Sequence, residues 1–248
     1  MEKVSVVIPL IPQHDSELLR IFKEISNESE IISEVIICRS ETIGIFSNFT
    51  LRRYAKWAHA AGLTSKIVLS HIRGSAPDGV NRNRGWEIAT GDYVVFLDAD
   101  DSYAKNRISS TISTMKLYNF DLFLHNYALE GESLAEVLEK NTTLQAVTLK
   151  VSKTQLNKGS LGPITDNTGN VLQIHHAHIS IRNSSIMRQI KFTNRFPGAD
   201  TEFCKRTVSS ELNCGYSSLK LSKWSRDRSL RYRLRLLRKK LKTSLSSK

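Results

Sequence analysis

The chain has 248 residues, 40% of them hydrophobic and 24% charged, with a formal net charge of +12. This composition predicts one globular domain with appended pieces and excludes a disordered chain. Three cysteines without CxxC spacing argue against a disulfide framework or zinc site. The sequence shows no signal-peptide pattern and no apolar run of membrane-spanning length, so we expect a cytoplasmic protein.

The first part of the chain alternates short apolar runs with helical segments. Strands are predicted at 4–10, 34–38, 66–70 and 93–97, and helices at 16–32, 51–61 and 83–90. Strands this apolar, separated by helices, are typical of a parallel sheet covered on both faces. Ligands of such sheets bind at the carboxyl ends of the strands.

Beyond Asp101 the pattern changes. A helix is predicted at 106–118 and a strand near 121–127. Residues 131–169 are polar and weakly periodic, which indicates a hairpin or a loop over the site.

Residues 173–182 alternate as a strand does. One face is apolar, and the other carries His176, His178, Ser180 and Arg182. Such a strand suits the wall of a polar site. The two imidazoles are interpreted either as contacts for a metal, a diphosphate or an acceptor, or as hydrogen-bonding groups within a polar crevice.

Three carboxylates, Asp98, Asp100 and Asp101, follow directly on the apolar run 93–97. Because like charges repel and lose hydration on burial, we expect a positive partner beside them. Asp-x-Asp at a strand end suits a divalent cation that bridges to a phosphorylated ligand, since Mg²⁺ and Mn²⁺ prefer oxygen ligands. The alternative is a solvated turn in which Asp101 or Ser102 caps the following helix.

Four segments occur in order that resemble the inverting GT-A glycosyltransferases of family 2: VSVVIP from Val4, EVII from Glu34, RNRG from Arg82 and ATGDYVVFLDADD from Ala89. The resemblance covers residues 4–115 and resumes near Gly198. It implies an α/β fold of the GT-A, Rossmann-like type, with a mainly parallel sheet and flanking helices. It divides the body into a nucleotide-sugar-binding half, 1–115, and an acceptor-binding and catalytic half, 116–222.

The resemblance also implies a nucleotide-sugar donor, expected to be a UDP-sugar, bound over the sheet edge. Arg82 is expected near the nucleobase. The donor-binding residues that it implies are Pro9, Ser40, Arg82, Asp98, Ala99 and Asp100. The ligands expected for a Mn²⁺ or Mg²⁺ cofactor are Asp98, Asp100, Asp101 and His178.

A second element, FPGADTEF at 196–203, resembles the family's Gly-Glu-Asp-x-x-Phe motif, which implies that Asp200 is the catalytic base. An acceptor hydroxyl is a poor nucleophile until a carboxylate within hydrogen-bond reach takes its proton. A metal meanwhile stabilises charge on the leaving diphosphate. The alternative is that Asp200 serves as the N-cap of a helix that follows it.

The chain departs from the family at three places. Leu10-Ile11-Pro12 stands in place of Thr-Tyr-Asn, Arg39-Ser40-Glu41-Thr42 in place of Asp-Asp-Gly-Ser, and Ala199 in place of an acidic neighbour of the base. Ser40 occupies the position expected for the base-binding aspartate. These losses indicate either an unusual donor nucleotide or a catalytically inactive relative. The alternative function is therefore that of an inactive, membrane-associated binding or scaffold protein.

The retained aspartates, Asp98, Asp100 and Asp200, favour an active enzyme. By resemblance we expect a glycosyltransferase that transfers a sugar from the donor to a glycan or lipid-linked acceptor, with inversion. The expected setting is the synthesis of a surface polysaccharide or lipopolysaccharide.

The basic charge is concentrated in the last segment, 223–248. Eleven Lys or Arg against one acid give it +10, which leaves +2 for residues 1–222, so no specific nucleic-acid partner is expected. A leucine stripe flanked by basic residues predicts a basic amphipathic C-terminal helix; its members are Leu230, Leu234, Leu237, Leu241 and Leu245.

Such a helix suits an anionic membrane surface, and with it a peripheral location on the cytoplasmic face. The alternatives are a helix that docks on the body or on a partner, and a solvated basic tail that meets RNA nonspecifically.

Overall fold

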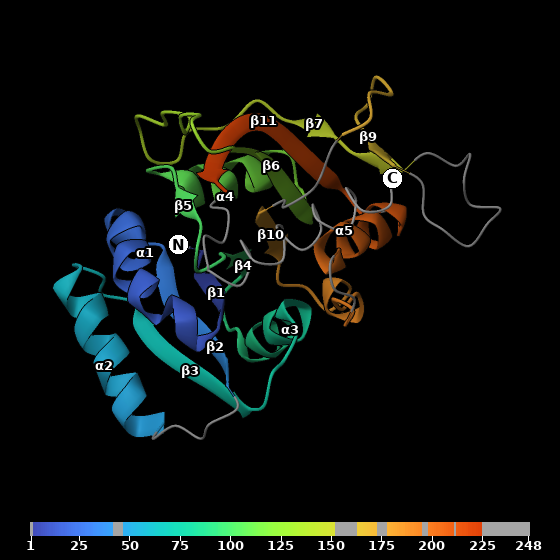
Figure 1. Cartoon of the computed structure of the whole chain (residues 1–248). Helices are drawn as coiled ribbons and strands as arrows, with labels where there is room; N and C mark the ends of the chain where they lie inside the picture. The colour runs from blue at the N-terminus through green and yellow to red at the C-terminus, as the bar shows by residue number, and fades with distance from the viewer. Residues whose placement is uncertain are drawn as a thin grey trace, which may run out of the picture.

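A mixed sheet of nine strands forms the centre of the computed structural model (Figure 1). The structure describes residues 2–41, 47–151, 163–172, 178–194, 198–210 and 212–224. The strand order is β3-β2-β1-β4-β10-β6-β11-β5, and β7 pairs with β11. The strands of this sheet are β1 (Val4–Leu10), β2 (Ile32–Glu41), β3 (Lys66–Arg73), β4 (Tyr93–Phe96), β5 (Ser102–Tyr103), β6 (Leu122–Ala128), β7 (Val147–Thr148), β10 (His178–Arg182) and β11 (Cys214–Lys223). A separate pair is formed by β8 (Lys150–Val151) and β9 (Ile164–Thr165).

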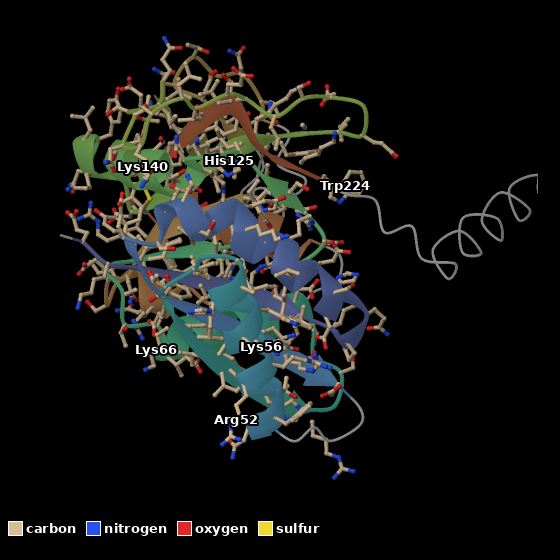
Figure 2. All side chains as sticks on the ribbon, turned by 90° about the vertical axis from the view of Figure 1, so that its left-hand side faces the viewer. Arg52, Lys56, Lys66, His125, Lys140 and Trp224 are labelled. Carbon is tan, nitrogen blue, oxygen red and sulfur yellow. The ribbon has the colours of Figure 1, made fainter. Side chains whose placement is uncertain are left out.

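Helices cover both faces of the sheet. On one face α1 (Leu18–Ile25), α2 (Ser47–Ala60) and α4 (Arg107–Leu117) share a hydrophobic cluster with alternate residues of β1. On the other face α3 (Asp78–Ile88) and α5 (Ala199–Ser209) pack through residues such as Trp86 and Phe203. Figure 2 views the molecule from the side on which α2 lies, beyond the edge strand β3.

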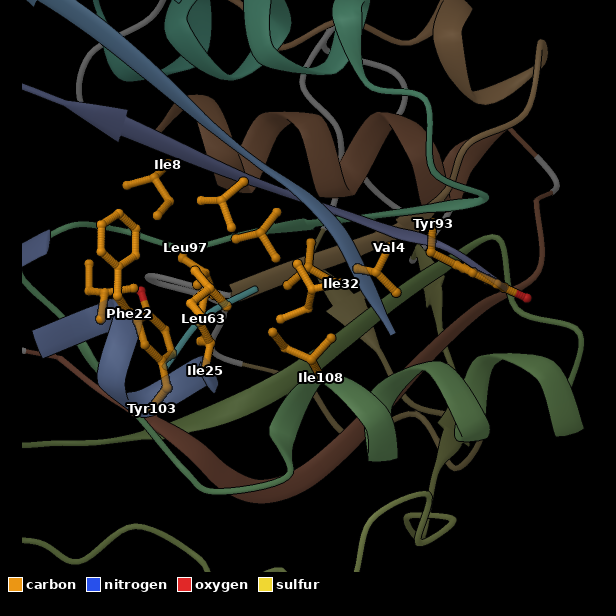
Figure 3. Close-up of a cluster of buried hydrophobic side chains, with 14 of the residues drawn as sticks. Val4, Ile8, Phe22, Ile25, Ile32, Leu63, Tyr93, Leu97, Tyr103 and Ile108 are labelled. Carbon is orange, nitrogen blue, oxygen red and sulfur yellow. The ribbon is translucent and has the colours of Figure 1, made fainter. Parts of the chain in front are cut away.

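The first half of the sheet is parallel, as the apolar runs predicted. β1 pairs in parallel with both β2 and β4, and β2 pairs in parallel with β3. Every residue of β1 and β4 is buried. Figure 3 shows Val4 and Ile8 of β1 in the same cluster as Phe22 and Ile25 of α1. The predicted α/β fold with a mainly parallel sheet and flanking helices is therefore confirmed.

The second half of the sheet is mixed, and two of its strands, β5 and β11, were not predicted. β10 runs antiparallel to β4 and β6, whereas β11 runs parallel to β6 and antiparallel to β5. The sequence of β11, CGYSSLKLSK, has no clean alternation, and its register with β6 shifts after Ser217 and after Lys220. The extra residue of a bulge interrupts the alternation of side chains, so the sequence of a bulged strand does not show a period of two.

Three helices predicted from the sequence have wrong boundaries. The helix expected at 51–61 begins earlier, at Ser47. The helix expected at 16–32 ends at Ile25, because Ser26–Glu28 form a 3₁₀ turn and Ile32 already opens β2. The helix expected at 83–90 begins earlier, at Asp78. Pro77 adopts an extended conformation just before it, and an acidic residue in the first turn is favourable beside the positive end of the helix dipole.

The segment expected as a hairpin or loop contains only short strands between 131 and 151, and residues 152–162 lie outside the described part. Residues 173–177 of the predicted strand, His176 among them, also lie outside it. β11 extends to Lys223, and the backbone N–H of Trp224 donates to the carbonyl of Ala128. The predicted C-terminal helix falls outside the described residues, so it stays a prediction. Within the described residues, every helix is too short or too polar to cross a bilayer.

Candidate functional site

Two carboxylates from distant parts of the chain meet at one arginine. Nη1 of Arg82 donates to Oδ1 of Asp200 over 2.7 Å, and Nη2 of Arg82 contacts the carboxylate of Asp98. Asp98 follows β4, Asp200 lies in the first turn of α5, and Arg82 lies in α3 with 5% of its surface exposed. This cluster lies beyond the carboxyl end of β4, where the sequence predicted a site.

The burial of Arg82 depends on how closely α3 lies on the sheet. Gly85 faces β1, and a Cβ atom there would lie 2.4 Å from Cγ1 of Val7 and 2.7 Å from the sulfur of Cys38. Only glycine permits this approach. The close packing holds the helix against the sheet and brings Arg82 to the two carboxylates.

The turn from Asp98 to Asp101 is fixed by side chains that sequence reasoning missed. Arg20 of α1 donates to the carbonyls of Asp101, at 2.8 Å, and Ala99, at 3.3 Å. The hydroxyl of Tyr103 donates to the carbonyl of Asp98 at 2.7 Å. The sequence holds no signal for these contacts, because the spacing of Arg20 from its acidic neighbours predicts only a surface ion pair within the helix.

Three potential metal ligands converge beside this turn. One ligand atom each from Asp98, Asp101 and His178 lies within 4.8 Å of the others. Nε2 of His178 lies 2.9 Å from Oδ2 of Asp101, and both side chains are almost fully buried. The carboxylate oxygens suit Mn²⁺ and Mg²⁺, and the imidazole suits the transition metal Mn²⁺ better than Mg²⁺.

Asp100 lies in the same turn but outside that group of ligand atoms. Burial, followed by the charges of Asp98 and Asp101, raises the pKa of Asp100 to about 7. A bound cation offsets both the burial of these carboxylates and the repulsion between them. The residues of the turn therefore fit a divalent metal, by their donor atoms and by their charge.

A buried polar chain supports His178 from behind. The ring of His125, on β6, stacks on that of His178 with centroids 5.7 Å apart. Nε of Arg107 donates to Nε2 of His125 over 2.7 Å, which assigns the ring proton of His125 to Nδ1, 2.8 Å from the carbonyl of Asn126. Burial and the charge of Arg107 lower the pKa of His125, so its ring stays neutral.

The positive charges expected beside the aspartates are therefore present. Arg82 contacts Asp98, and Arg107, whose pKa burial lowers to about 10, lies beneath the site with its guanidinium 5.1 Å from the centroid of the Tyr103 ring. Neither Arg107 nor His125 was identified from the sequence. The sequence offered one signal for His125, which is its position within the otherwise apolar start of β6.

The remaining expected donor-binding residues lie at the ends of neighbouring strands. Pro9 is buried near the end of β1, and Ala99 is buried in the turn after β4. Ser40 is buried near the end of β2, where its hydroxyl accepts from Nδ2 of Asn81 at 3.2 Å. Arg39, its neighbour, forms ion pairs with Asp15 and Glu41.

Asp200 and Asp101 do not act as helix N-caps, which was the alternative to a functional role for each. The N-cap of α5 is Gly198, at a positive φ of 106°, so Asp200 is the second residue of the helix. Asp101 is 2% exposed, and the N-cap of α4 is Asn106. Both aspartates thus face the cluster around Arg82 and His178.

The sequence of the chain is similar to those of known proteins. Residues 66–191, about half of the chain, match the family described as Glycosyl transferase family 2. A segment of 56 residues is 41% identical to the amylovoran biosynthesis glycosyltransferase AmsB of Erwinia amylovora, covering 23% of this chain and 18% of that protein.

Similar solved structures cover nearly the whole chain. TarS 1–349 of S. aureus, in complex with UDP-GlcNAc, is 14% identical with a TM-score of 0.63 over 92% of this chain and 59% of that one. Glucosyl-3-phosphoglycerate synthase of Mycobacterium tuberculosis, in complex with Mg²⁺ and UDP, is 16% identical with a TM-score of 0.57 over 93% of this chain and 74% of that one. At these identities the likeness shows a shared fold. The chain spans under two thirds of the length of TarS 1–349 and far less of AmsB.

Proposed function

The chain belongs to glycosyl transferase family 2 and carries that family's glycosyltransferase domain, and from this we propose that it transfers a sugar from a nucleotide-sugar donor to a hydroxyl of a glycan or lipid-linked acceptor, with inversion. The observation that carries this proposal is the bridge from Asp98 to Asp200 through Arg82. It joins the side of the site that suits a diphosphate and its metal to the side that suits an acceptor.

Asp200 is proposed as the general base. Its carboxylate takes the proton of the acceptor hydroxyl as that oxygen attacks the anomeric carbon and the bond to the diphosphate breaks. A single displacement of this kind inverts the anomeric configuration. Arg82 orients the carboxylate of Asp200 through the 2.7 Å contact and is therefore a positioning residue.

Asp98, Asp101 and His178 are proposed to hold Mn²⁺ or Mg²⁺, with Asp100 adding negative charge beside them. When bound, the ion supplies positive charge for the leaving diphosphate. His125 and Arg107 hold His178 in place through ring stacking and a hydrogen bond. Arg20 and Tyr103 hold the backbone of the turn, so the carboxylates keep their positions.

The donor is proposed to be a UDP-sugar, bound near Pro9, Ser40, Arg82, Asp98, Ala99 and Asp100. Support comes from solved structures of the same fold, which contain UDP-GlcNAc or UDP. The relative named for amylovoran biosynthesis supports a role in polysaccharide synthesis. The basic segment 223–248 supports a peripheral location on the cytoplasmic face of a membrane, close to lipid-linked acceptors.

A second function is favoured by one specific observation. Ser40 stands where the family has an aspartate, and Arg39 beside it is engaged by Asp15 and Glu41 rather than placed toward a ligand. Under this alternative the protein is an inactive relative that binds a partner or a membrane.

One assay separates the two functions. Active transferase is expected to show a raised melting temperature with UDP-sugar and Mn²⁺, together with slow release of UDP. Asp98→Asn is expected to lose both effects while remaining folded, and Asp92→Asn, on an exposed turn, to keep them. Stabilisation without UDP release, and without transfer to any glycan acceptor, would support the inactive relative. No response to any nucleotide sugar would contradict the proposed donor.

A further inference from the structure

One segment of the body is basic although the body as a whole is nearly neutral. Between residues 42 and 77 there is no Asp or Glu, whereas there are five Lys or Arg. The described part of this segment folds as α2 and the edge strand β3, which pack against each other. The five positive charges are therefore gathered in one structural unit at the edge of the sheet.

α2 has a buried face and an exposed face that follow the helical period. Thr50, Tyr54 and Ala58 are buried. Phe49, Arg52 and Lys56 lie on the opposite side and are exposed. Figure 2 looks directly onto this side, with Arg52 and Lys56 on α2 and Lys66 at the start of β3.

We define the α2–β3 face by its exposed cationic and apolar side chains, which are Phe49, Arg52, Lys56 and Arg73. Phe49 is 69% exposed. Lys66 and Ile72 are left out because side chains alternate along β3, which places both on the opposite side of the strand, toward α3. Within the described part of the chain, Arg52, Lys56 and Arg73 form no salt bridge. Arg53 is left out of the face because it pairs with Asp15.

We propose that the α2–β3 face docks on an anionic lipid surface. Each basic residue held near such a surface strengthens binding about fivefold. Exposed Phe49, which lies among the cations, matches the boundary between headgroups and acyl chains, where apolar side chains leave water. A duplex nucleic acid matches the cations but offers no apolar layer for Phe49.

The face also has a definite relation to the proposed site. α2 begins shortly after the carboxyl end of β2, and β3 ends at Arg73 on the same edge of the sheet (Figure 1). Phe49 and Arg73 therefore lie on the edge beyond which Asp98 and Asp200 are placed. Docking through this face brings that edge toward the lipid, which suits a lipid-linked acceptor. This orientation rests on the proposed function, whereas the docking does not.

Vesicle binding by the full chain tests the proposal. The face variant is Arg52→Gln, Lys56→Gln and Arg73→Gln, and the matched control is Lys3→Gln, Lys23→Gln and Lys150→Gln, which removes the same charge from exposed positions elsewhere. In sedimentation with phosphatidylglycerol vesicles, the face variant is expected to bind about a hundredfold more weakly than the native chain, and the control less than fivefold more weakly. The basic segment 223–248 stays in place in all three proteins.

A second measurement reads the face directly. The three native cysteines are buried, so an environment-sensitive dye on Lys56→Cys reports from that position. Its emission is expected to shift to the blue with anionic vesicles, and the same dye on Lys150→Cys is expected not to shift. Melting temperature and UDP release by the face variant, measured without vesicles, are expected to match the native chain, which keeps this test separate from the proposed function.

Three outcomes would overturn the docking. The first is equal loss of vesicle binding in the face variant and the control, which would indicate only net charge. The second is an unshifted dye at position 56. The third is loss of binding to single-stranded RNA, rather than to vesicles, in the face variant.

Discussion

The guanidinium of Arg82 donates a 2.7 Å hydrogen bond from Nη1 to Oδ1 of Asp200. The second terminal nitrogen of Arg82 contacts Asp98, so one buried cation balances two carboxylates that are distant in sequence. Both partners keep some exposure, 27% for the side chain of Asp98 and 21% for that of Asp200. Solvent therefore screens each pair in part.

Arg82→Gln is expected to lower the free energy of unfolding by about 2 kcal/mol, because it leaves two neighbouring carboxylates without their cation. Urea denaturation measures the change. In the double variant Arg82→Gln, Asp200→Asn the loss is expected to be smaller than the sum of the single losses, since the unpaired charge of Asp200 is gone. Strict additivity would show that the contact contributes nothing to stability.

The affinity for Mn²⁺ is expected to depend on pH through Asp100. Burial and two neighbouring carboxylates raise the pKa of Asp100 to about 7, so below that pH a proton on Asp100 removes one of the negative charges that attract the cation. Calorimetric titration is expected to show affinity falling as the pH is lowered below 7, by no more than about tenfold per pH unit. In Asp100→Asn this dependence is expected to become weaker between pH 6 and 8. A flat profile in the native protein would contradict the assignment.

The raised pKa of Asp100 also predicts an effect on the free energy of unfolding. Ionisation of Asp100 favours metal binding but disfavours folding. Because the pKa of Asp100 is higher in the folded protein than in the unfolded chain, its ionisation opposes folding, fully above pH 7 and not at all below the unfolded pKa near 3.8. Without metal, Asp100→Asn is expected to raise the free energy of unfolding at pH 8 and to leave it unchanged at pH 3.5. Urea denaturation at the two pH values checks this, and equal changes at both would contradict it.

Glu34 anchors the turn before β4 and gives a stability prediction outside the site. Burial alone would raise its pKa, but hydrogen bonds from the hydroxyl of Ser5 and from the N–H and hydroxyl of Thr90 outweigh burial and lower it. The stabilisation is thus present above the unfolded pKa of 4.5 and is lost as pH falls through the folded value.

Glu34→Gln is expected to lower the free energy of unfolding by about 1 kcal/mol at pH 7. The difference from the native protein is expected to shrink as the pH falls below 4. Glu87→Gln, an exposed change on α3, serves as the control and is expected to stay within about 0.5 kcal/mol. A loss at pH 3.5 as large as at pH 7 would show that the charge of Glu34 is irrelevant.

Much of the parallel sheet and part of the site could be predicted from the sequence. The apolar runs of β1 and β4 are long enough to be recognised, and a strand that ends in carboxylates points to the edge where ligands bind. The alternation in β10 correctly placed His178 on the face opposite to Ile179 and Ile181. These features are local, so their periods are visible in the sequence.

The features that could not be predicted depend on contacts between distant residues. Arg20 reaches the carbonyl of Asp101 across 81 positions of the chain, and no local pattern encodes that contact. Arg107 and His125 belong to different elements and form their pair only after α4 has packed near β6. β11 owes its burial to pairing with β6 and β5 rather than to an apolar sequence.

Deleting residues 225–248 leaves β11 and the Trp224 backbone contact intact. The truncated protein is expected to bind anionic vesicles more than tenfold more weakly, because most of the charge of the basic segment is lost. Transfer to membrane acceptors is expected to slow more than transfer to soluble ones. Unchanged sedimentation with vesicles, or binding of the intact protein that high salt fails to weaken, would contradict a membrane role for this segment.

The most direct test of the proposed transferase is the rate of sugar transfer by Asp200→Asn, followed as UDP release from a UDP-sugar. The variant keeps the shape of the side chain but cannot accept a proton at neutral pH, so the rate is expected to fall about a hundredfold or more. The donor dissociation constant is expected to change less than about threefold. Glu202→Gln, two residues further along the same helix, is expected to keep its rate. An Asp200→Asn protein that retains most of its transfer rate would contradict the assignment of Asp200 as the base.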